Sequence, residues 1–396
     1  MVKALSASLL YAGTDDHDID LFEGQYAVPE GMAYNSYVIR GEKIAVLDTV
    51  DGRKTAEWME NIEQALDGRQ PDYLIVQHME PDHSASIAAF LEKYSGAAVV
   101  GNAKTFAMLA KYFPNLELKN TLTVKEGDTL ALGSRTLRFL MAPMVHWPEV
   151  MMTYDETDNV LFSADAFGKF GSLDTSGDWT CEARRYYFGI VGKYGKQVQS
   201  LLKKLSAFSL KMICPLHGPV LTENLEKYVS LYNTWSAYEP EDAGICICCA
   251  SVYGHTREAA ELLREELQKR GASVVCFDLT RCDLSEAVED AFRYDTLVLA
   301  STTYNGGVFP CMKTFLTHLT ERNFQRRSVA LMENGSWAPM ANKVMREVLE
   351  SSGQPLSFAE NSVTVNAALN ADGIGQIRAL AEELAGKAGG PGADRQ

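Results

Sequence analysis

Cysteines are scarce in this sequence. Only 8 of the 396 residues are cysteine, too few for a scaffold held together by disulfides. Cys246 and Cys249 have C-x-x-C spacing, but they lie in an apolar run, residues 244–250, that is typical of a buried strand. Residues three apart in a strand face opposite sides, so we do not expect this pair to bind one metal ion. Without a second C-x-x-C motif, a tetrathiolate iron or zinc site is excluded.

Positive charge and long apolar runs are scarce as well. Lys and Arg total 37 against 52 Asp and Glu, which gives a net charge of −15. A protein this acidic is repelled by phosphate backbones, so nucleic acid is not expected as a partner. No apolar run approaches the roughly 20 residues that span a membrane, and the first 13 residues lack the features of a signal peptide. We therefore expect a cytoplasmic protein without membrane contact.

The length predicts more than one domain, at roughly 150 residues per domain. Residues 1–240 mix short strand-like runs with helical patterns, which favours a layered α/β sandwich. A short charged segment with a proline, residues 238–242, then breaks the pattern. In residues 244–388 five apolar strands alternate with helices, the pattern of a doubly wound parallel sheet. Residues 389–396 are glycine-rich at their start, and we predict a flexible tail there.

The strongest chemical signal is a group of metal-competent side chains in the first half. The segment His78-Met79-Glu80-Pro81-Asp82-His83 follows a strand-like run, and we expect Pro81 to prevent a helix from starting there, so that a loop turns these side chains inward. Three further candidates follow later predicted strands. Any one of these histidines alone is more often structural, but the set together predicts metal binding. The candidate ligands are His78, Glu80, Asp82, His83, His146, Asp165 and His217.

The kinds of ligand indicate which metal is bound. Four imidazoles and three carboxylates, without a thiolate, suit iron or manganese. Sites for two such ions usually hold them about 3.5–4 Å apart, with a bridging carboxylate. Two Fe²⁺ carry four positive charges and the three carboxylates offset three of them, which leaves room for a bridging hydroxide.

Three polar loops in the second half predict a phosphate-bearing cofactor with a flat ring. The first loop opens a helix, whose free N–H groups and dipole suit phosphate, and Gly254 allows close approach. This loop is not G-x-x-x-x-G-K-[ST], so a nucleoside triphosphate is not expected. Tyr304 and Trp337 could flank a ring, with Asn305, Gly306 and Gly307 at its polar edge. The predicted cofactor-binding residues are Ser251, Val252, Tyr253, Gly254, His255, Thr256, Ser301, Thr302, Thr303, Tyr304, Asn305, Gly306, Gly307, Asn334, Gly335, Ser336 and Trp337.

These motifs resemble those of a known family. The first half is similar to the metallo-β-lactamase fold (an αββα sandwich), whose hydrolases hold zinc with H-x-H-x-D-H. Here Glu80 stands in place of the second histidine. The resulting H-x-E-x-D-H pattern resembles that of the flavodiiron proteins, and the sequence Tyr-Asn-Gly-Gly at 304–307 is similar to their FMN-binding loop. The resemblance implies one iron held by His78, Glu80 and His146, a second held by Asp82, His83 and His217, and Asp165 as a bridge together with a hydroxide or water.

The resemblance extends over about residues 31–384 and implies a function. Flavodiiron proteins with only these two domains reduce O₂ to water or NO to N₂O, with electrons relayed through FMN. The donor is another molecule, such as rubredoxin or another small redox protein, because this chain has no rubredoxin-like cysteine set. The family's head-to-tail homodimer, alone or as a dimer of dimers, brings the FMN of one subunit to the irons of the other.

Three aromatic residues near the candidate ligands are expected to shape catalysis. Trp147 follows His146 directly, and Tyr186 or Tyr187 could donate a phenol proton, although all three could instead be core residues. Two other functions remain open at this point. One is a zinc hydrolase fused to a flavodoxin module, and the other is an FMN-binding electron shuttle that has lost its metal. Both gases use the same ligands, so the motifs do not distinguish O₂ from NO.

Overall fold

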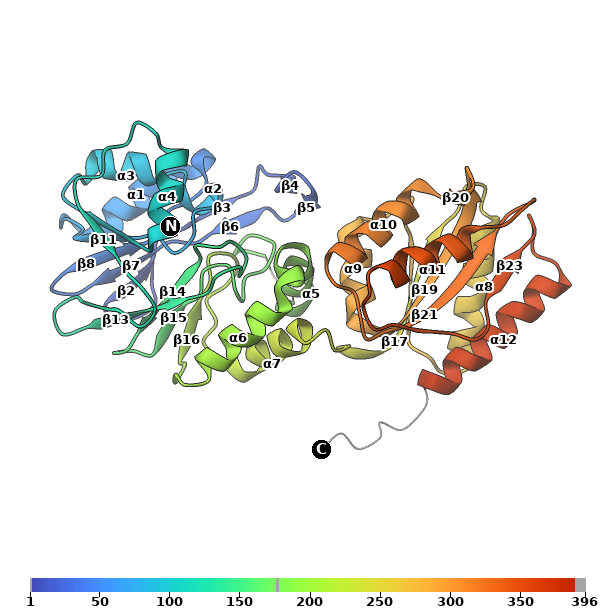
Figure 1. The fold of residues 1–396 in the computed structure, drawn as a ribbon. Coiled ribbons are helices and arrows are strands. Elements are labelled where there is room, and N and C mark those ends of the chain that lie inside the picture. Colours follow the sequence, from blue (N-terminus) through green and yellow to red (C-terminus); the bar gives the residue numbers. More distant parts are fainter. Residues whose placement is uncertain (1, 176–177, 389–396) are drawn as a thin grey trace. The chain divides into compact units, whose positions relative to one another are not determined.

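The structure is a computed structural model that describes residues 2–175 and 178–388. The chain divides into two units, Met1–Asn233 and Thr234–Gln396. In Figure 1 the first unit runs from blue to yellow-green and the second from yellow to red. The predicted flexible tail, residues 389–396, lies outside the described residues. None of the helices in the described part of the chain has the length and apolar composition that crossing a membrane requires.

The first unit is built on two mixed sheets. One has seven strands in the order β1-β2-β7-β8-β9-β10-β11, and the other has five in the order β12-β13-β14-β15-β16. The bounds in the first sheet are Lys3–Ala4 (β1), Leu9–Tyr11 (β2), Tyr37–Arg40 (β7), Ile44–Leu47 (β8), Tyr73–Ile75 (β9), Ala98–Gly101 (β10) and Thr121–Thr123 (β11). Those in the second are Thr129–Ala131 (β12), Thr136–Met141 (β13), Met151–Asp155 (β14), Val160–Phe162 (β15) and Met212–Cys214 (β16).

The two sheets pack face to face, as the predicted sandwich requires. Tyr37 and Ile39 of β7 share one core cluster with Phe139 of β13 and Phe162 of β15. Val38, between them in sequence, points to the opposite face, because successive side chains in a strand alternate, and joins a second cluster with helix residues. The helices in that cluster are α1 (Thr55–Leu66), α3 (Ile87–Lys93) and α4 (Ala103–Tyr112). In Figure 1, α6 (Gly195–Leu205) lies beside the second sheet.

Short elements connect these layers. Two small antiparallel pairs join β3 (Thr14–Asp16) to β6 (Met32–Tyr34), and β4 (Leu21–Phe22) to β5 (Tyr26–Ala27). Helix α5 (Trp179–Tyr186) continues into a π-helical turn, Tyr187–Val191. The remaining short helices are 3₁₀ turns at Gly52–Lys54 and Gly192–Tyr194, and α7 covers Leu225–Ser236.

The prediction that Pro81 prevents a helix is wrong. Helix α2 begins at this residue and covers Pro81–Ser84. The first residue of a helix needs no N–H partner, and the fixed φ of proline suits that position. The predicted metal-binding segment is therefore divided: His78 and Glu80 precede the helix, whereas Asp82 and His83 lie on it.

The second unit contains the predicted doubly wound sheet. Its order is β18-β17-β19-β21-β22, and these strands pair in parallel. The bounds are Asp242–Ala250 (β17), Val274–Asp278 (β18), Tyr294–Tyr304 (β19), Ser328–Asn334 (β21) and Ser357–Phe358 (β22). A short strand, β23 (Val363–Val365), also pairs in parallel with β21, so the fifth position of the sheet is filled by two short strands. Strand β20 (Gly307–Val308) forms a hairpin with β19.

Helices lie on both faces of this sheet (Figure 1). Helices α8 (His255–Lys269) and α12 (Ala371–Ala388) share a core cluster with Ile245, Ile247 and Cys249 of β17. The other helices are α9 (Leu284–Arg293), α10 (Pro310–Glu321) and α11 (Ala341–Ser351). Cys246 lies outside that cluster, and its Sγ is 3.7 Å from Sγ of Cys248. Cys246 and Cys249 therefore face opposite sides of the sheet, as the strand pattern predicts.

Candidate metal centre and cofactor pocket

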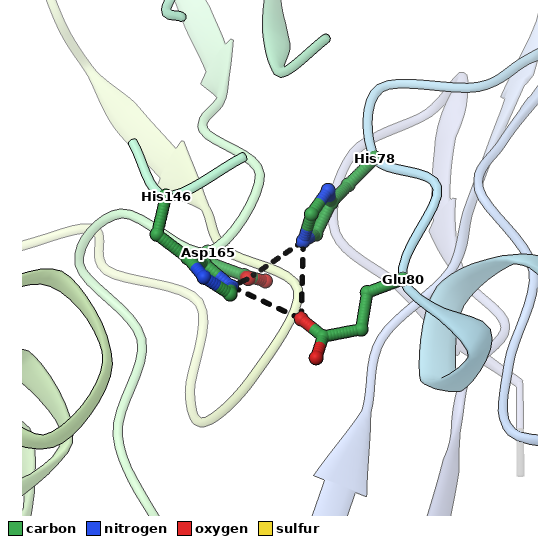
Figure 2. A group of neighbouring side chains, drawn as sticks. All are labelled: His78, Glu80, His146 and Asp165. Atoms are coloured by element: carbon green, nitrogen blue, oxygen red, sulfur yellow. Dashed lines mark hydrogen bonds and ion pairs between the residues drawn. The ribbon is translucent and has the colours of Figure 1, made fainter. Parts of the chain in front are cut away.

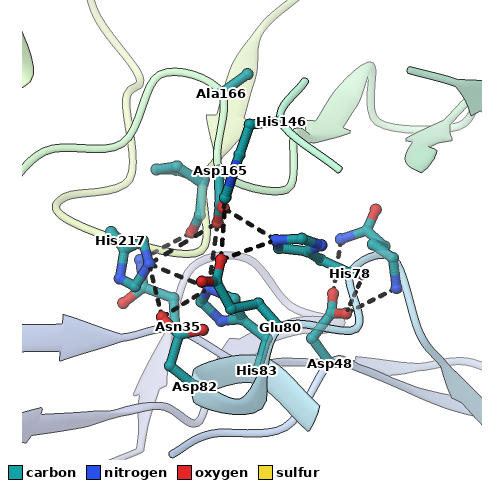
Figure 3. Close-up of polar contacts among 12 residues, drawn as sticks. Asn35, Asp48, His78, Glu80, Asp82, His83, His146, Asp165, Ala166 and His217 are labelled. Carbon is teal, nitrogen blue, oxygen red and sulfur yellow. Dashed lines mark hydrogen bonds and ion pairs between the residues drawn. The ribbon is translucent and has the colours of Figure 1, made fainter. Parts of the chain in front are cut away.

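The structure brings all seven predicted metal ligands together. They come from the ends of strands in both sheets of the first unit: two follow β9, two lie on α2, and one each follows β13, β15 and β16. Figure 3 shows the side chains converging on one place. Their ligand atoms form two groups, each with all atoms within 4.8 Å of one another: His78, Glu80, His146 and Asp165 in the first group, and Asp82, His83 and His217 in the second.

In the first group, two carboxylate oxygens face two imidazole nitrogens (Figure 2). Glu80 Oε2 lies 3.2 Å from His78 Nε2 and 3.0 Å from His146 Nε2. Asp165 Oδ2 lies 3.3 Å from His78 Nε2 and 3.0 Å from His146 Nε2. Four donor atoms therefore surround one point.

In the second group, Asp82 Oδ2 lies 3.3 Å from His83 Nε2 and 3.2 Å from His217 Nε2. The other oxygen of Asp165, Oδ1, turns toward this group and lies 3.1 Å from His83 Nε2 and 3.8 Å from His217 Nε2. Asp165 thus directs one oxygen to each group. This is the arrangement that a carboxylate bridging two metal ions needs.

The second group contains buried carboxylate oxygens that accept no hydrogen bond. His217 Nδ1 lies 2.7 Å from the carbonyl oxygen of Ala33, so Nδ1 carries the hydrogen and Nε2 keeps a lone pair in the neutral ring. That Nε2 lies 3.0 Å from His83 Nε2. Neither oxygen of Asp82, nor Oδ1 of Asp165, accepts a hydrogen bond, although these atoms are buried. Buried carboxylate oxygens that accept no hydrogen bond, beside two imidazole nitrogens, fit metal cations. Oxygen and nitrogen ligands of this kind suit iron or manganese.

The charges of the site reinforce one another. Burial lowers the pKa of His78, but the carboxylates around it, Asp165 above all, raise it well above the usual histidine range. Burial raises the pKa of Asp165, but His78 and His83 hold it well below the usual aspartate range. Burial also lowers the pKa of His146, yet Asp165 and Glu80 raise it to about 9. The carboxylates therefore attract positive charge, which protons supply in the metal-free protein and metal ions would supply instead.

Two buried carboxylates that the sequence analysis missed orient the segment carrying His78. Glu149 Oε1 lies 2.8 Å from His78 Nδ1. Asp48 accepts from the backbone N–H groups of Gln77 at 2.7 Å and of His78 at 3.3 Å, and Figure 3 shows it beside this segment. The only sequence signal for Glu149 was its position three residues after His146, and Asp48 gave none.

The three predicted catalytic aromatics lie in different places. The Trp147 ring meets His78 edge to face at 5.2 Å between centroids. The Tyr186 ring lies 5.5 Å from His217, and its buried hydroxyl has no hydrogen-bond partner among the described residues. The Tyr187 ring packs against Tyr232 at 5.1 Å. Phe22, which the sequence analysis did not single out, contacts His217 at 5.4 Å.

A pocket of about 570 Å³ lies at the carboxyl ends of the second unit's strands. The three predicted loops supply most of its lining, and Ala338, Met340 and Ala367 were not predicted. Three predicted residues do not line it. Gly254 is the N-cap of α8, with a φ of 99° that favours glycine; Ser301 is buried within β19, and Gly307 begins β20. The predicted residues that line the pocket are Ser251, Val252, Tyr253, His255, Thr256, Thr302, Thr303, Tyr304, Asn305, Gly306, Asn334, Gly335, Ser336 and Trp337.

Local interactions fix the loops of this pocket. Asn305 and Gly306 both have positive φ, 50° and 71°, as the two central residues of a type I′ hairpin require. Thr256 Oγ1 lies 2.8 Å from Thr302 Oγ1, which joins the first loop to the second. Around the pocket, the side chains of Tyr253 and Trp337 remain 91% and 82% exposed. Large exposed rings beside a pocket suit a flat ligand that covers them.

Comparisons with known proteins agree with the division of the chain into two units. Residues 32–218 match the family described as ODP family beta lactamase, and residues 246–362 match a flavodoxin domain. The chain is 28% identical over 360 residues to an uncharacterized protein of Methanocaldococcus jannaschii, covering 89% of this chain and 90% of that protein. It is 29% identical over 340 residues to the anaerobic nitric oxide reductase flavorubredoxin of Vibrio vulnificus, covering 83% and 68%.

Solved structures share the fold of the whole chain. The rubredoxin oxygen:oxidoreductase of Desulfovibrio gigas matches with a TM-score of 0.90 at 23% identity and covers 98% of both chains. The flavodiiron protein of Giardia intestinalis matches with a TM-score of 0.91 at 23% identity, covering 98% of this chain and 97% of that one. With its two domain matches in this order and the shared fold, the chain resembles the flavodiiron proteins.

Proposed function

We propose that this protein is an oxidoreductase that reduces O₂ to water or NO to N₂O at a pair of iron ions, with electrons relayed through FMN. The observation that carries the proposal is the position of Asp165, whose two oxygens face two separate groups of ligands. The names of the relatives, nitric oxide reductase flavorubredoxin and rubredoxin oxygen:oxidoreductase, support it. The zinc hydrolase alternative is not favoured, because Glu80 offers an oxygen where those hydrolases have a histidine.

The seven ligands would hold the two irons in the two groups described above. When bound, a ferrous pair supplies a site for O₂ or for two NO molecules. The chain's own residues would have distinct tasks: Asp165 would offer one oxygen to each position, Trp147 packs edge to face against His78, and Tyr186 keeps a phenol proton beside His217. Burial raises the pKa of Tyr186 well above the usual range, with Asp165 adding to the effect, so its hydroxyl stays protonated.

The pocket of the second unit would hold FMN. The N-terminal end of α8, with Ser251 and Thr256 beside it, suits the phosphate. Tyr304 and Trp337 offer exposed rings for the flavin. When bound, FMN supplies the ability to accept electrons in pairs and to release them singly.

The proposed partners follow from the names of the similar proteins. We propose an external electron donor, rubredoxin or another small redox protein, because the structural neighbour from Desulfovibrio gigas is named a rubredoxin oxygen:oxidoreductase. Four thiols of this chain are free and buried: Cys214, Cys246, Cys248 and Cys249. Free buried thiols also favour a reducing compartment, the cytoplasm. We further propose a diiron domain at residues 1–240 and an FMN domain at 244–388, assembled as a head-to-tail homodimer or a dimer of dimers.

Stopped-flow kinetics tests the proposed function directly. The full chain, loaded with iron and FMN, is reduced without oxygen and mixed separately with O₂ and with NO. We expect at least one gas to reoxidise the flavin faster than it reoxidises free FMN, and faster than in the same protein loaded with FMN but without iron. If neither gas does so, the reductase function is refuted. Light scattering alongside turnover tests the assembly, since an active dilute monomer would contradict the head-to-tail dimer.

A further inference from the structure

The two groups of metal ligands differ in what lies behind their histidines. In the first group, His78 Nδ1 faces the carboxylate of Glu149 at 2.8 Å. In the second group, His217 Nδ1 faces a neutral backbone carbonyl, that of Ala33, at 2.7 Å. His83 Nδ1 is buried and has no hydrogen-bond partner among the described residues. Among the described residues, therefore, only the first group has a carboxylate from outside the ligand set hydrogen-bonded to one of its imidazoles.

The hydrogen bonds of Glu149 place a hydrogen on Nδ1 of His78, in the protonated ring and in the neutral ring alike. The backbone N–H of Met79 donates to Glu149 Oε1 at 2.9 Å, so this oxygen is an acceptor. The same oxygen lies 2.8 Å from His78 Nδ1, which must then be an N–H donor. In the neutral ring, Nε2 is left with its lone pair, and it faces Glu80 Oε2 and Asp165 Oδ2. Glu149 thus selects the tautomer that a metal ion needs.

Glu149 is held firmly enough to have this effect. Its residue is fully buried, and its carbonyl oxygen accepts from Asn102 Nδ2 at 2.5 Å. Asn102 is itself fixed as the N-cap of α4, where it accepts from two backbone N–H groups. The other buried carboxylate of this region, Asp48, accepts hydrogen bonds from N–H groups of Gln77 and His78, and none is found between it and His83 Nδ1 among the described residues. Asp48 therefore does not provide His83 with an equivalent partner.

We propose that Glu149 is a positioning residue that makes the two metal positions unequal. A carboxylate hydrogen-bonded to a ligating imidazole fixes the ring and makes it a stronger electron donor. Glu149 does this for the position formed by His78, Glu80 and His146, and for no histidine of the other group. The first position consequently stabilises the more highly charged metal ion, so of two irons the one held there is oxidised at the lower potential. The identity of the metal in this statement rests on the proposed function.

Metal binding to the metal-free full chain tests the asymmetry without any gas reduction. The probe is Co²⁺ alone, whose visible absorption reports its ligands. The isosteric variant Glu149→Gln keeps an acceptor oxygen but loses the charge, and Glu117→Gln makes the same change at an exposed, unbonded glutamate of the same unit. We expect Glu149→Gln to lower the affinity for one of the two Co²⁺ ions by about 10- to 100-fold and to leave the affinity for the other unchanged. Glu117→Gln should bind both ions as the wild type does. Equal weakening of both ions, or none, would overturn the proposal.

Reduction potentials of the iron-loaded protein distinguish an effect of Glu149 on the potential of one iron from a purely structural role of this residue. A redox titration followed by electron paramagnetic resonance of the irons is run apart from the flavin absorbance. Glu149→Gln should raise the potential of one iron and narrow the gap between the two, whereas Glu149→Asp, which keeps the charge, should restore the gap. A purely structural Glu149 would give wild-type potentials in the Gln variant, and that result would refute the proposal. Neither measurement depends on O₂ or NO turnover, so the proposed function stands or falls separately.

Discussion

Substitution of Glu80 tests whether this carboxylate selects the metal. Its Oε2 lies 3.0 Å from His146 Nε2 and 3.2 Å from His78 Nε2, within the first group of ligands. Glu80→Gln removes one negative charge with little change in shape. For unit charges about 4 Å apart at an effective dielectric constant of about 20, one such charge is worth about 4 kcal/mol. This corresponds to about a thousandfold in metal affinity at that position.

Metal content is the direct readout. The metal-free protein is loaded with Fe²⁺ alone, or with equal amounts of Fe²⁺ and Zn²⁺, and the metals are measured by mass spectrometry. We expect two irons per chain in the wild type and about one in Glu80→Gln. Glu80→His restores a ligand but not the charge, so this variant should bind two metal ions but prefer zinc to iron. Its rate of gas reduction should fall together with its iron content. Full iron content and full activity in both variants would refute the role assigned to Glu80, and Glu117→Gln serves as the matched control.

Three further predictions concern other parts of the two sites. In the metal-free protein, burial lowers the pKa of His146 but Asp165 and Glu80 raise it to about 9, so the ring is protonated at pH 7 and a metal ion must displace that proton. Metal affinity should therefore rise from pH 7 to about pH 9, with proton release measurable by calorimetry in two buffers; a flat pH profile would contradict this. Tyr186→Phe should lower turnover by about a hundredfold while the iron and FMN content stays unchanged. Tyr112→Phe, at the surface, should have no effect on turnover. An unchanged rate in Tyr186→Phe would show that Tyr186 does not supply a proton. Trp337→Ala should weaken FMN binding by about fivefold, from about 1 kcal/mol of lost aromatic contact, as read from quenching of FMN fluorescence; unaltered affinity would show that the ring does not stack.

The strands of the second unit were predictable because their signal is local. A buried parallel strand is a continuous apolar run, and a polar loop after it lies at the sheet edge where ligands bind. This reasoning located most residues of the pocket but not Ala367, which follows the short strand β23. Helix α12 was also not predicted as an element. Ser301 was assigned to a loop because sequence does not show that β19 continues to Tyr304 and turns back through a hairpin.

The metal ligands were predictable as a set but not as two groups. Their residue types and their places after strands can be seen in the sequence. The prediction about Pro81 was wrong because proline interrupts a helix in its interior but is well suited to its first position. The division into groups depends on contacts such as that between His83 and His217, which are 134 residues apart. Only the packing of one sheet on the other brings such residues together.

The sequence by itself determined the kinds of ligand, the acidic charge of the chain, the order of its two domains and the resemblance to the flavodiiron proteins. The tertiary structure decided the division of labour among those residues. It turns the two oxygens of Asp165 toward different groups and sets Glu149, 71 residues away in the chain, behind His78. The physical reason is that hydrogen bonds and metal sites depend on distances of about 3 Å, and those distances are fixed by long-range packing rather than by neighbours in sequence.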